Sequence, residues 1–495
     1  MEKYYLTTPI YYVNARPHIG HVYTTVAADA LARWERFLGK EVFFLTGTDE
    51  HGSKIAASAD ESGITPKELA DSMVQHYRDL WEILEVRFDR LIRTTEPEHE
   101  KIVQTTFLTL YRKGDIYPGT YQGYYCISCE NYLTPAEGKV CPDCGRTVDQ
   151  ISESTYFFRL SRYQEALKEY FRNHPEFIQP PQIKDEINNM LTLPLPDLSL
   201  TRRCDWGVPL PAEIISKEPL SIYVWFDALL NYLSGVGGPD GTHYKKFWPP
   251  DVHIIGKDII RFHHIIWPAI LMALELPLPK KIFAHGWWLS GGEKMSKSRG
   301  NVVEPFGFCQ QYGSESLRYF LLAEVPFGLD GDFTETSFKK RYNSDLANDL
   351  GNLIHRFNHL IRTNSGGKVP RPGDGGTMAE KTLNIFPELI QKMENLDFYG
   401  FLGKVRQVVA SANKYLDEQA PWRQGQNAEE VLYNLTEVSR ILSLYLKPVL
   451  PRTAELIRGQ LGLSDLPETK DAVRWGLTPA GADVSKAPPL FPRIK

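Results

Sequence analysis

Two short stretches of the chain combine the residue types that bind and neutralise phosphate groups. The first, His18-Ile19-Gly20-His21, follows an apolar run at a point where we expect a strand to end and a helix to begin. The start of a helix presents backbone N–H groups and a positive dipole end, and Gly20 leaves room for a nucleotide to approach. Two histidines three residues apart lie on one helix face and can both donate to phosphate oxygens. The alternative is a helix start with polar caps, so this stretch alone is a weak indication.

The second stretch is Lys294-Met295-Ser296-Lys297-Ser298, which follows Gly291-Gly292 and precedes Arg299-Gly300-Asn301. A loop bounded by glycines can move, and its lysines can meet the negative charge that builds on a departing pyrophosphate. The alternative is a solvated basic loop. Five specified residues in one order make this the stronger of the two motifs, and Lys294 and Lys297 are the candidate catalytic cations.

Four of the six cysteines form two Cys-x-x-Cys pairs, Cys126 with Cys129 and Cys141 with Cys144. Thiolates spaced in this way close a tetrahedral four-sulfur zinc site with no open position. The alternatives are a redox role or four unligated cysteines. We expect one structural Zn²⁺ per chain, holding together a segment too short for its own core.

The first motif lies between elements that the sequence predicts clearly. A strand is expected over Lys3 to Val13, and an apolar stripe through Val22, Val26, Ala30 and Trp34 predicts the helix after it. Gly39 ends this helix, and Glu41 to Leu45 is the next strand. A second set of strands is expected near Ser221 to Phe226, Val252 to Ile255 and Lys281 to Ala284, with a helix over Ile259 to Leu274. This pattern predicts an α/β fold with a doubly wound parallel sheet of Rossmann type.

Composition changes along the chain divide it into five expected parts. Residues 1–115 and 221–340 are the two halves of the nucleotide-binding domain, and 116–220 is an insertion that holds the zinc knuckle at 126–144. Residues 341–470 are helical, with one apolar stripe through Leu346, Leu350, Leu353 and Phe357, and predict an α-helical bundle. Ser365 to Gly376 is an expected loop within it, and 471–495 is a C-terminal tail.

The overall composition excludes several classes of protein. The 495 residues are 42% hydrophobic and 24% charged, and the net charge of -5 argues against non-specific coating of nucleic acid. The N-terminus has no pattern of a cleaved signal peptide, and no apolar run reaches the length of a membrane span. We therefore expect a cytoplasmic protein that binds no membrane.

Together, in this order and on this scaffold, the two phosphate motifs resemble the paired signatures of class I aminoacyl-tRNA synthetases. The chain resembles the methionyl-tRNA synthetases in particular over essentially its whole length, through TTPIYYVNARPHIGH, FLTGTDEHG, IYVWFDALLNY, HIIGKDIIRFHHIIWP and HGWWLSGGEKMSKSRGN. The resemblance implies that His18, Gly20 and His21 bind the phosphates of ATP, which arrives with Mg²⁺. It also implies that Lys294 and Lys297 stabilise the transition state of attack by the substrate carboxylate on the α-phosphate.

The same resemblance assigns the walls of the substrate pocket. Gly256, Asp258 and Trp288 would border the adenosine, with Asp258 on the ribose hydroxyls, and Asp49 would pair with the ammonium group of the amino acid. The methionine side chain would lie among Ile10, Tyr12, Trp225, Ala228, Leu229, Tyr232, Ile259 and His263. Aromatic walls suit a polarizable sulfur, to which Tyr12 or His263 could donate a weak hydrogen bond. The alternatives are core packing for the aromatics and a helix cap for Asp49; Leu229 departs from a proline found in some members.

Four residues of the helical part are candidate readers of RNA bases. Asn352 and Arg356 lie four apart on one helix face, and Pro421-Trp422 stands at a turn. An exposed tryptophan offers a stacking platform for an unpaired base, while Arg and Asn can read base edges. The resemblance implies recognition of the CAU anticodon of initiator and elongator tRNA(Met). The alternative for Trp422 is packing between helices.

The resemblance leaves several competing classes to be separated. Leucine, isoleucine and valine enzymes carry a large editing insertion, for which the segment between His21 and Lys294 has no room, and cysteine enzymes use dispersed zinc ligands. A nucleotidyltransferase that makes a small adenylylated compound would have no use for the bundle, and every motif position is intact, which disfavours a non-catalytic RNA-binding module. Some family members continue into a dimerising RNA-binding domain. This chain ends at Lys495, so we expect a monomer.

Overall fold

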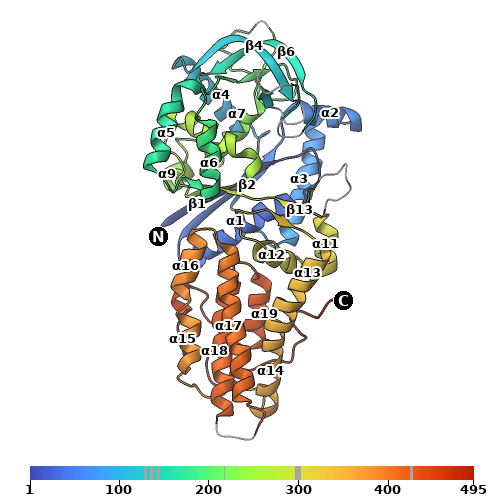
Figure 1. Cartoon of the computed structure of the whole chain (residues 1–495), viewed down its shortest axis with the longest axis vertical. Helices are drawn as coiled ribbons and strands as arrows, with labels where there is room; N and C mark the ends of the chain where they lie inside the picture. The colour runs from blue at the N-terminus through green and yellow to red at the C-terminus, as the bar shows by residue number, and fades with distance from the viewer. Residues whose placement is uncertain (127–130, 134–138, 142–144, 217, 296–302, 424–426) are drawn as a thin grey trace.

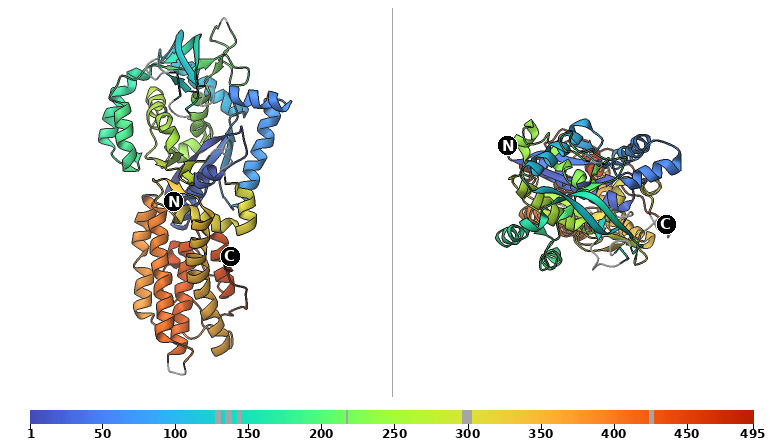
Figure 2. Two further views of the ribbon diagram at one scale, coloured as in Figure 1. Left: turned by 45° about the vertical axis from the view of Figure 1, so that its right-hand side comes forward. Right: turned by 90° about the horizontal axis from the view of Figure 1, so that it is seen from above.

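The computed structural model describes residues 1–126, 131–133, 139–141, 145–216, 218–295, 303–423 and 427–495, with only the backbone at 131, 132 and 294. The molecule is elongated, with an α/β part at one end and a bundle of long helices at the other (Figure 1). The left view of Figure 2 shows the same two parts, with the N-terminus near the level at which they meet.

A six-stranded parallel sheet forms the centre of the α/β part. Its strands lie in the order β3-β2-β1-β11-β12-β7, and every described pairing is parallel. Their bounds are β1 Lys3–Tyr12, β2 Glu41–Asp49, β3 Arg90–Arg93, β7 Ile178–Gln179, β11 Val252–Gly256 and β12 Ile282–His285. The strand order reverses between β1 and β11, and ligands bind at such a switch point in open α/β sheets. The predicted α/β fold with a parallel sheet is confirmed.

Helices on both faces cover this sheet. Those of the first half are α1 Ile19–Phe37, α2 Ser53–Ser62, α3 Pro66–Ile83 and α4 Pro97–Arg112. The stripe that predicted α1, Val22, Val26, Ala30 and Trp34, is fully buried. The expected helix over Ile259 to Leu274 is one helical stretch: a short turn at Lys257–Ile259, a π-helix at Phe262–Ile266 and α10 Trp267–Ala273.

One predicted strand is wrong. Of Ser221 to Phe226 only β10 Ser221–Ile222 is extended, and it pairs with β9 Thr201–Arg202 outside the main sheet. The chain then forms α7 Val224–Leu229. A short apolar run does not distinguish a buried strand from a buried helix, because both faces are covered in either case. α8 Asn231–Ser234 and α9 Thr242–Phe247 follow.

The segment from 116 to 220 contains a second, antiparallel sheet in the order β5-β4-β6-β8. Its strands are β4 Ile116–Cys126, β5 Asn131–Leu133, β6 Asp149–Phe158 and β8 Leu198–Ser199. Two helices, α5 Gln164–Asn173 and α6 Pro181–Met190, flank the strand β7. Since β7 is the edge strand of the main sheet, this segment is joined to the α/β core by backbone pairing as well as by side-chain packing.

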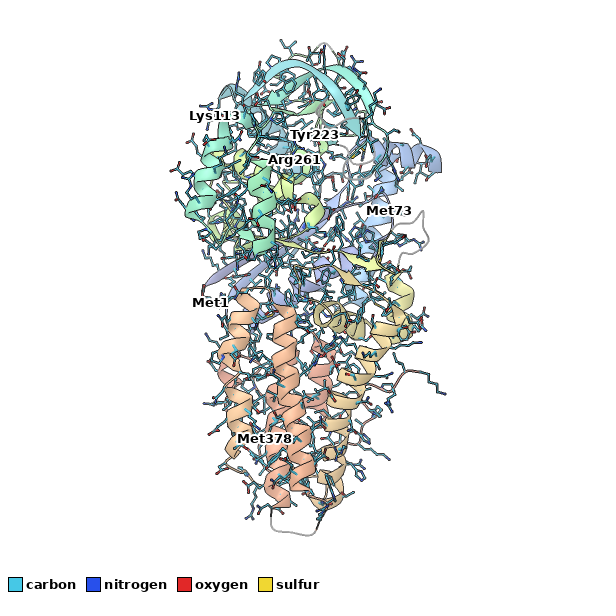
Figure 3. All side chains as sticks on the ribbon, in the orientation of Figure 1. Met1, Met73, Lys113, Tyr223, Arg261 and Met378 are labelled. Carbon is cyan, nitrogen blue, oxygen red and sulfur yellow. The ribbon has the colours of Figure 1, made fainter. Side chains whose placement is uncertain are left out.

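Long helices form the second part of the molecule. After the hairpin strands β13 Trp288–Ser290 and β14 Glu293–Lys294 come α11 Pro305–Tyr312, α12 Ser314–Ala323, β15 Gly331–Asp332 and α13 Glu335–Arg341. The bundle continues with a π-helix at Tyr342–Gly351, α14 Asn352–Asn364, α15 Gly376–Leu383, α16 Phe386–Glu394, α17 Phe398–Gln419, α18 Ala428–Leu446 and α19 Pro451–Gln460. The predicted stripe Leu346, Leu350, Leu353 and Phe357 is buried in it. Met378, labelled in Figure 3, lies on α15 within this bundle.

A buried cation joins the two parts. Arg318 of α12 has no exposed surface, and its guanidinium donates to the Asp29 carboxylate of α1 at 2.7 Å. It also donates to the carbonyl oxygens of Leu84, at the end of α3, and of Pro448 and Val449, between α18 and α19. Helix α1, which begins beside His18, therefore shares one ion pair with the bundle.

No helix among the described residues is long and apolar enough to cross a membrane. The C-terminal tail runs along the bundle, where Phe491 packs on Tyr342 and Asn343 exchanges hydrogen bonds with Ile494.

Candidate active site

A cavity of about 580 Å³ opens at the carboxyl ends of β1, β2, β11 and β12, at the switch point of the sheet. Every predicted ATP- and methionine-binding residue whose side chain is described lines it: Ile10, Tyr12, His18, Gly20, His21, Asp49, Trp225, Ala228, Leu229, Tyr232, Gly256, Asp258, Ile259, His263 and Trp288. Residues far apart in the sequence meet here because the carboxyl ends of parallel strands share one edge of the sheet.

The two histidines of the first motif begin helix α1. His18 is the N-cap, where its Nδ1 accepts from the Gly20 N–H at 3.1 Å. His21 Nδ1 accepts in turn from the His18 N–H at 3.2 Å, and the two rings stack with centroids 3.9 Å apart. Since both Nδ1 atoms accept, the proton of each neutral ring lies on Nε2, which makes the Nε2 atoms the donors. A Cβ at position 20 would lie 2.9 Å from the His18 ring, so any larger residue would displace that ring.

The second motif begins in the last strand of a β-hairpin at the rim of the cavity. β13 pairs antiparallel with β14, and Gly291 and Gly292 form the two-residue turn with φ of 62° and 77°. Positive φ at both positions is typical of hairpin turns, so these glycines shape the turn. Met295 follows β14 and lines the cavity. The backbone of Lys294 belongs to β14, whereas Lys297 lies outside the described residues.

At one end of the cavity, Asp258 is exposed just beyond β11. The Trp287 indole donates to its carboxylate at 3.2 Å and so fixes its orientation. Trp288 is 5% exposed, and its indole N–H has no hydrogen-bond partner among the described residues. A buried donor that lines a cavity without a partner suits an acceptor atom on a ligand.

At the other end, His263 and Tyr232 form a buried pair. Burial lowers the pKa of His263 to about 4, so the ring is neutral at pH 7. Its Nδ1 donates to the Ile259 carbonyl at 3.0 Å, and its Nε2 accepts from the Tyr232 hydroxyl at 2.8 Å. Both ring nitrogens of His263 have protein partners in this arrangement, and donation from Tyr12 or His263 to a sulfur stays a prediction.

The remaining walls of this end are apolar or aromatic. Trp225 stacks on Phe262 at a centroid distance of 3.7 Å, and Ala228 and Leu229 are buried beside it. Asp49, an acidic residue that also lines the cavity, ends β2. The N-cap of α2 is Gly52, so Asp49 stands before the cap position and does not cap that helix. The alternative of a helix cap is excluded.

Sequence reasoning missed several residues of the cavity wall, among them His285 and Trp287. His285 ends β12 and Trp287 lies just beyond it; both line the cavity, and His285 lies 2.7 Å from the Thr24 hydroxyl. Burial lowers the pKa of His285. Both residues belong to the run HGWW, and the rule that ligands bind beyond the carboxyl ends of parallel strands could have identified them.

Two of the four predicted zinc ligands are described. Cys126 ends β4 and Cys141 begins a turn closed by the Gly145 N–H, which donates to the Cys141 carbonyl at 2.8 Å. Both cysteines are 1% exposed and pack around Leu133. Cys129 and Cys144 lie outside the described residues. Two buried thiols packed around one leucine are compatible with two ligands of a zinc knuckle, which stays a prediction.

The predicted RNA-reading residues lie at the end of the bundle away from the cavity. Trp422 is 47% exposed, just beyond α17, so it is not fully packed between helices. The Arg356 guanidinium lies 5.7 Å from the centre of its ring and is held by Asp417. Asn352 is exposed on the same helix as Arg356, and the Pro421 carbonyl accepts from Asn364.

Known proteins resemble this chain along its whole length. The profile of the family described as tRNA synthetases class I (M) matches residues 4–155 and 146–358. The methionine–tRNA ligase of Caldanaerobacter subterraneus subsp. tengcongensis is 46% identical, over all of this chain and 79% of its own length. That of Thermotoga maritima is 41% identical, over 99% of this chain and 80% of its own length.

Solved structures agree with these sequence relatives. The Mycobacterium tuberculosis methionyl-tRNA synthetase in complex with methionyl-adenylate superposes with a TM-score of 0.94 at 37% identity, covering 100% of both chains. The apo form of the same enzyme gives a TM-score of 0.88 at 34% identity, covering 100% of this chain and 99% of the other. By sequence and by structure, the chain belongs to the methionine–tRNA ligase family of class I tRNA synthetases.

Proposed function

We propose that the chain charges tRNA(Met), initiator and elongator, with L-methionine in two steps. The methionine carboxylate attacks the α-phosphate of ATP, and methionyl-adenylate and pyrophosphate are formed. The 3′-terminal hydroxyl of the tRNA then attacks the adenylate carbonyl, and AMP leaves. The convergence of the residues predicted to bind ATP and methionine on one cavity, in a chain of this family, carries the proposal. Pyrophosphate exchange that depends on methionine tests it, and exchange that is indifferent to methionine would refute it.

The proposed catalysis is positioning and electrostatics, because the substrate supplies its own nucleophile. His18 and His21 donate from Nε2 to the phosphates, a role supported by their shared tautomer at the start of α1. Lys294 and Lys297 neutralise charge as pyrophosphate departs. Mg²⁺ arrives with ATP and screens the phosphate charges.

Recognition of methionine is assigned to the two walls of the cavity. Asp49 pairs with the ammonium group, while Tyr12, Trp225 and Ile10 enclose the thioether with the residues of α7. On the nucleotide side, Asp258 accepts from the ribose hydroxyls, and the orientation imposed by Trp287 supports this role.

We also propose one structural Zn²⁺ per chain, held by Cys126, Cys129, Cys141 and Cys144. Removing zinc with a chelator, followed by desalting into Mg²⁺ buffer, is expected to lower aminoacylation at least severalfold and to expose the 116–220 segment to proteolysis. Metal analysis should give one zinc per chain in the untreated protein and in Cys204→Ser, and much less in Cys126→Ser. A zinc-free sample with full activity and unchanged proteolysis would contradict the proposal.

Trp422 and its neighbours Asn352, Arg356 and Pro421 are proposed to read the CAU anticodon. Trp422→Ala is expected to lower kcat/KM for tRNA charging about tenfold or more, since stacking on one base contributes about 1–3 kcal/mol. Methionine-dependent exchange should stay within twofold, because the tryptophan is remote from the cavity. The exposed Tyr399→Ala, at the other end of α17, is a matched control that should leave both reactions unchanged. If Trp422→Ala lowered the rates of both half-reactions together, the role of Trp422 would be structural and it would not read a base.

A cytoplasmic location is proposed because charged tRNA is consumed there in protein synthesis. The expected monomer stays a prediction, which light scattering of the purified chain measures.

A further inference from the structure

A buried carboxylate stands directly behind the proposed methionine pocket. Asp227 lies in α7 between Trp225 and Ala228, which line the cavity, but its own side chain is absent from the lining and has no exposed surface. Its two oxygens bind two histidines. The His51 Nδ1 lies 2.8 Å from Oδ2, and the His99 Nε2 lies 2.7 Å from Oδ1.

The two histidines come from different elements. His51 follows β2, two residues after Asp49, in the turn that leads to α2. His99 belongs to the first turn of α4, and its Nδ1 lies 2.6 Å from the Ser234 hydroxyl of α8. One carboxylate therefore connects α7 with the segment after β2, two residues beyond Asp49, and with α4, which is bonded in turn to α8. Tyr223, labelled in Figure 3, immediately precedes α7.

The bond between His51 and Asp227 carries charge. Burial disfavours the imidazolium form, but the Asp227 carboxylate outweighs it and raises the pKa of His51 above its ordinary value. The same pairing lowers the pKa of Asp227 to about 2 against the effect of burial. Two further carboxylates face His51: Glu100 of α4, at 3.8 Å from its Nε2, and Glu50, which is held by Arg93. The ring of Trp206 packs on His51, and the cation Arg202 lines the same small pocket.

We propose that Asp227, His51 and His99 are positioning residues that hold α7 at the separation from Asp49 that methionine requires, and so set the affinity for methionine without touching it. The proposal rests on the assignment of this cavity to methionine. Charge-assisted hydrogen bonds are about twice as strong as neutral ones, so the pair fixes the two walls more firmly while His51 is protonated.

A dependence on pH follows from the raised pKa of His51. The stabilising charge is fully present below the ordinary pKa of histidine, near 6.5, and is lost as the pH rises through the higher pKa of the folded protein. The KM for methionine should therefore rise over this interval, while the KM for ATP should not.

His51→Asn in the full-length chain tests the proposal, because the amide keeps a donor near the Nδ1 position but carries no charge. At pH 6.5 the Kd for methionine, measured by tryptophan fluorescence, and its KM in pyrophosphate exchange are expected to rise about tenfold, because a charge-assisted hydrogen bond is replaced by a weaker neutral one. The kcat and the KM for ATP should change less than twofold. Once the pH exceeds the raised pKa of His51, the variant and the wild type should converge, and the variant should show only the titration of methionine itself.

Two further variants complete the test. Asp227→Asn should raise the Kd for methionine at least as much as His51→Asn does, and if it fails to fold, His51→Asn still decides. His243→Asn replaces an exposed histidine of α9 and should retain the wild-type pH profile.

A Kd of His51→Asn within twofold of wild type at every pH would overturn the proposal. So would an equal loss in the Kd for methionine, the KM for ATP and the thermal midpoint, which would assign a general structural role. Failure of the proposed function is distinguishable, because wild-type exchange would then not require methionine at any pH.

Discussion

His18→Asn is expected to lower the kcat of methionine-dependent ATP–pyrophosphate exchange roughly a hundredfold while leaving the thermal midpoint unchanged. Removing one well-placed donor to a transition-state oxyanion lowers kcat by about 10²–10³. Asparagine retains the N-cap hydrogen bond to the Gly20 N–H, because its side-chain oxygen can replace the accepting Nδ1. It has no donor at the distance of Nε2.

His18→Ala is the matched comparison, since it removes the donor and the cap together. It should show the same loss in kcat and, in addition, about 1 kcal/mol less stability. Exchange kinetics and thermal unfolding of the two variants therefore separate catalysis from capping. A His18→Asn variant that kept wild-type kcat would leave His18 as a helix cap only.

Arg318→Met is expected to reduce the free energy of unfolding by about 3–5 kcal/mol, the usual cost of removing one partner from a buried ion pair. The substitution leaves Asp29 with Arg33 as its remaining cation, and it strips the carbonyls of Leu84, Pro448 and Val449 of a donor. Urea unfolding followed by circular dichroism at pH 7 measures the loss. Arg78→Met, on the exposed side of α3, should stay within about 0.5 kcal/mol.

The pH dependence of this effect has a defined sign. Burial raises the pKa of Asp29, but Arg318 and Arg33 outweigh it and hold the pKa below its ordinary value. A depressed carboxylate pKa contributes stability above about pH 4, which is lost as the pH falls through the lower pKa of the folded state. As the pH is lowered from 5 through the pKa of Asp29, the free energy of unfolding of Arg318→Met should therefore fall less than that of the wild type. A loss below 1 kcal/mol at pH 7 would mean that the desolvation of Arg318 offsets its interactions.

Local patterns were sufficient to predict the elements around the phosphate motifs. The stripe through Val22 and Trp34 identified α1, and apolar runs identified β1, β2, β11 and β12. Once the strands are parallel, their carboxyl ends share an edge, so Gly20, Asp49 and Asp258 had to face one another. The apolar run before Phe226 was ambiguous, because a buried helix and a buried strand have the same composition.

The contacts that fix the site could not be predicted in this way. Asp227 meets His51 and His99 across large sequence separations, and no periodicity pairs them. The tautomer of His263 follows from the positions of the Ile259 carbonyl and the Tyr232 hydroxyl, which only the fold determines. The buried position of Arg318 could not be predicted from its place in a helix, because its partners belong to α1, α3 and the bundle.

The straight helix α17 has a consequence for substrate choice. It runs for 22 residues, from Phe398, which packs on Phe327 near the α/β part, to the turn that presents Trp422. At a rise of 1.5 Å per residue it is about 33 Å long. With the roles proposed above, the length of this helix sets the separation between the anticodon-reading residues and the α/β part. An RNA fragment that carries only an anticodon or only an acceptor end can occupy one site but cannot reach the other. The enzyme therefore selects an RNA by its length as well as by its bases.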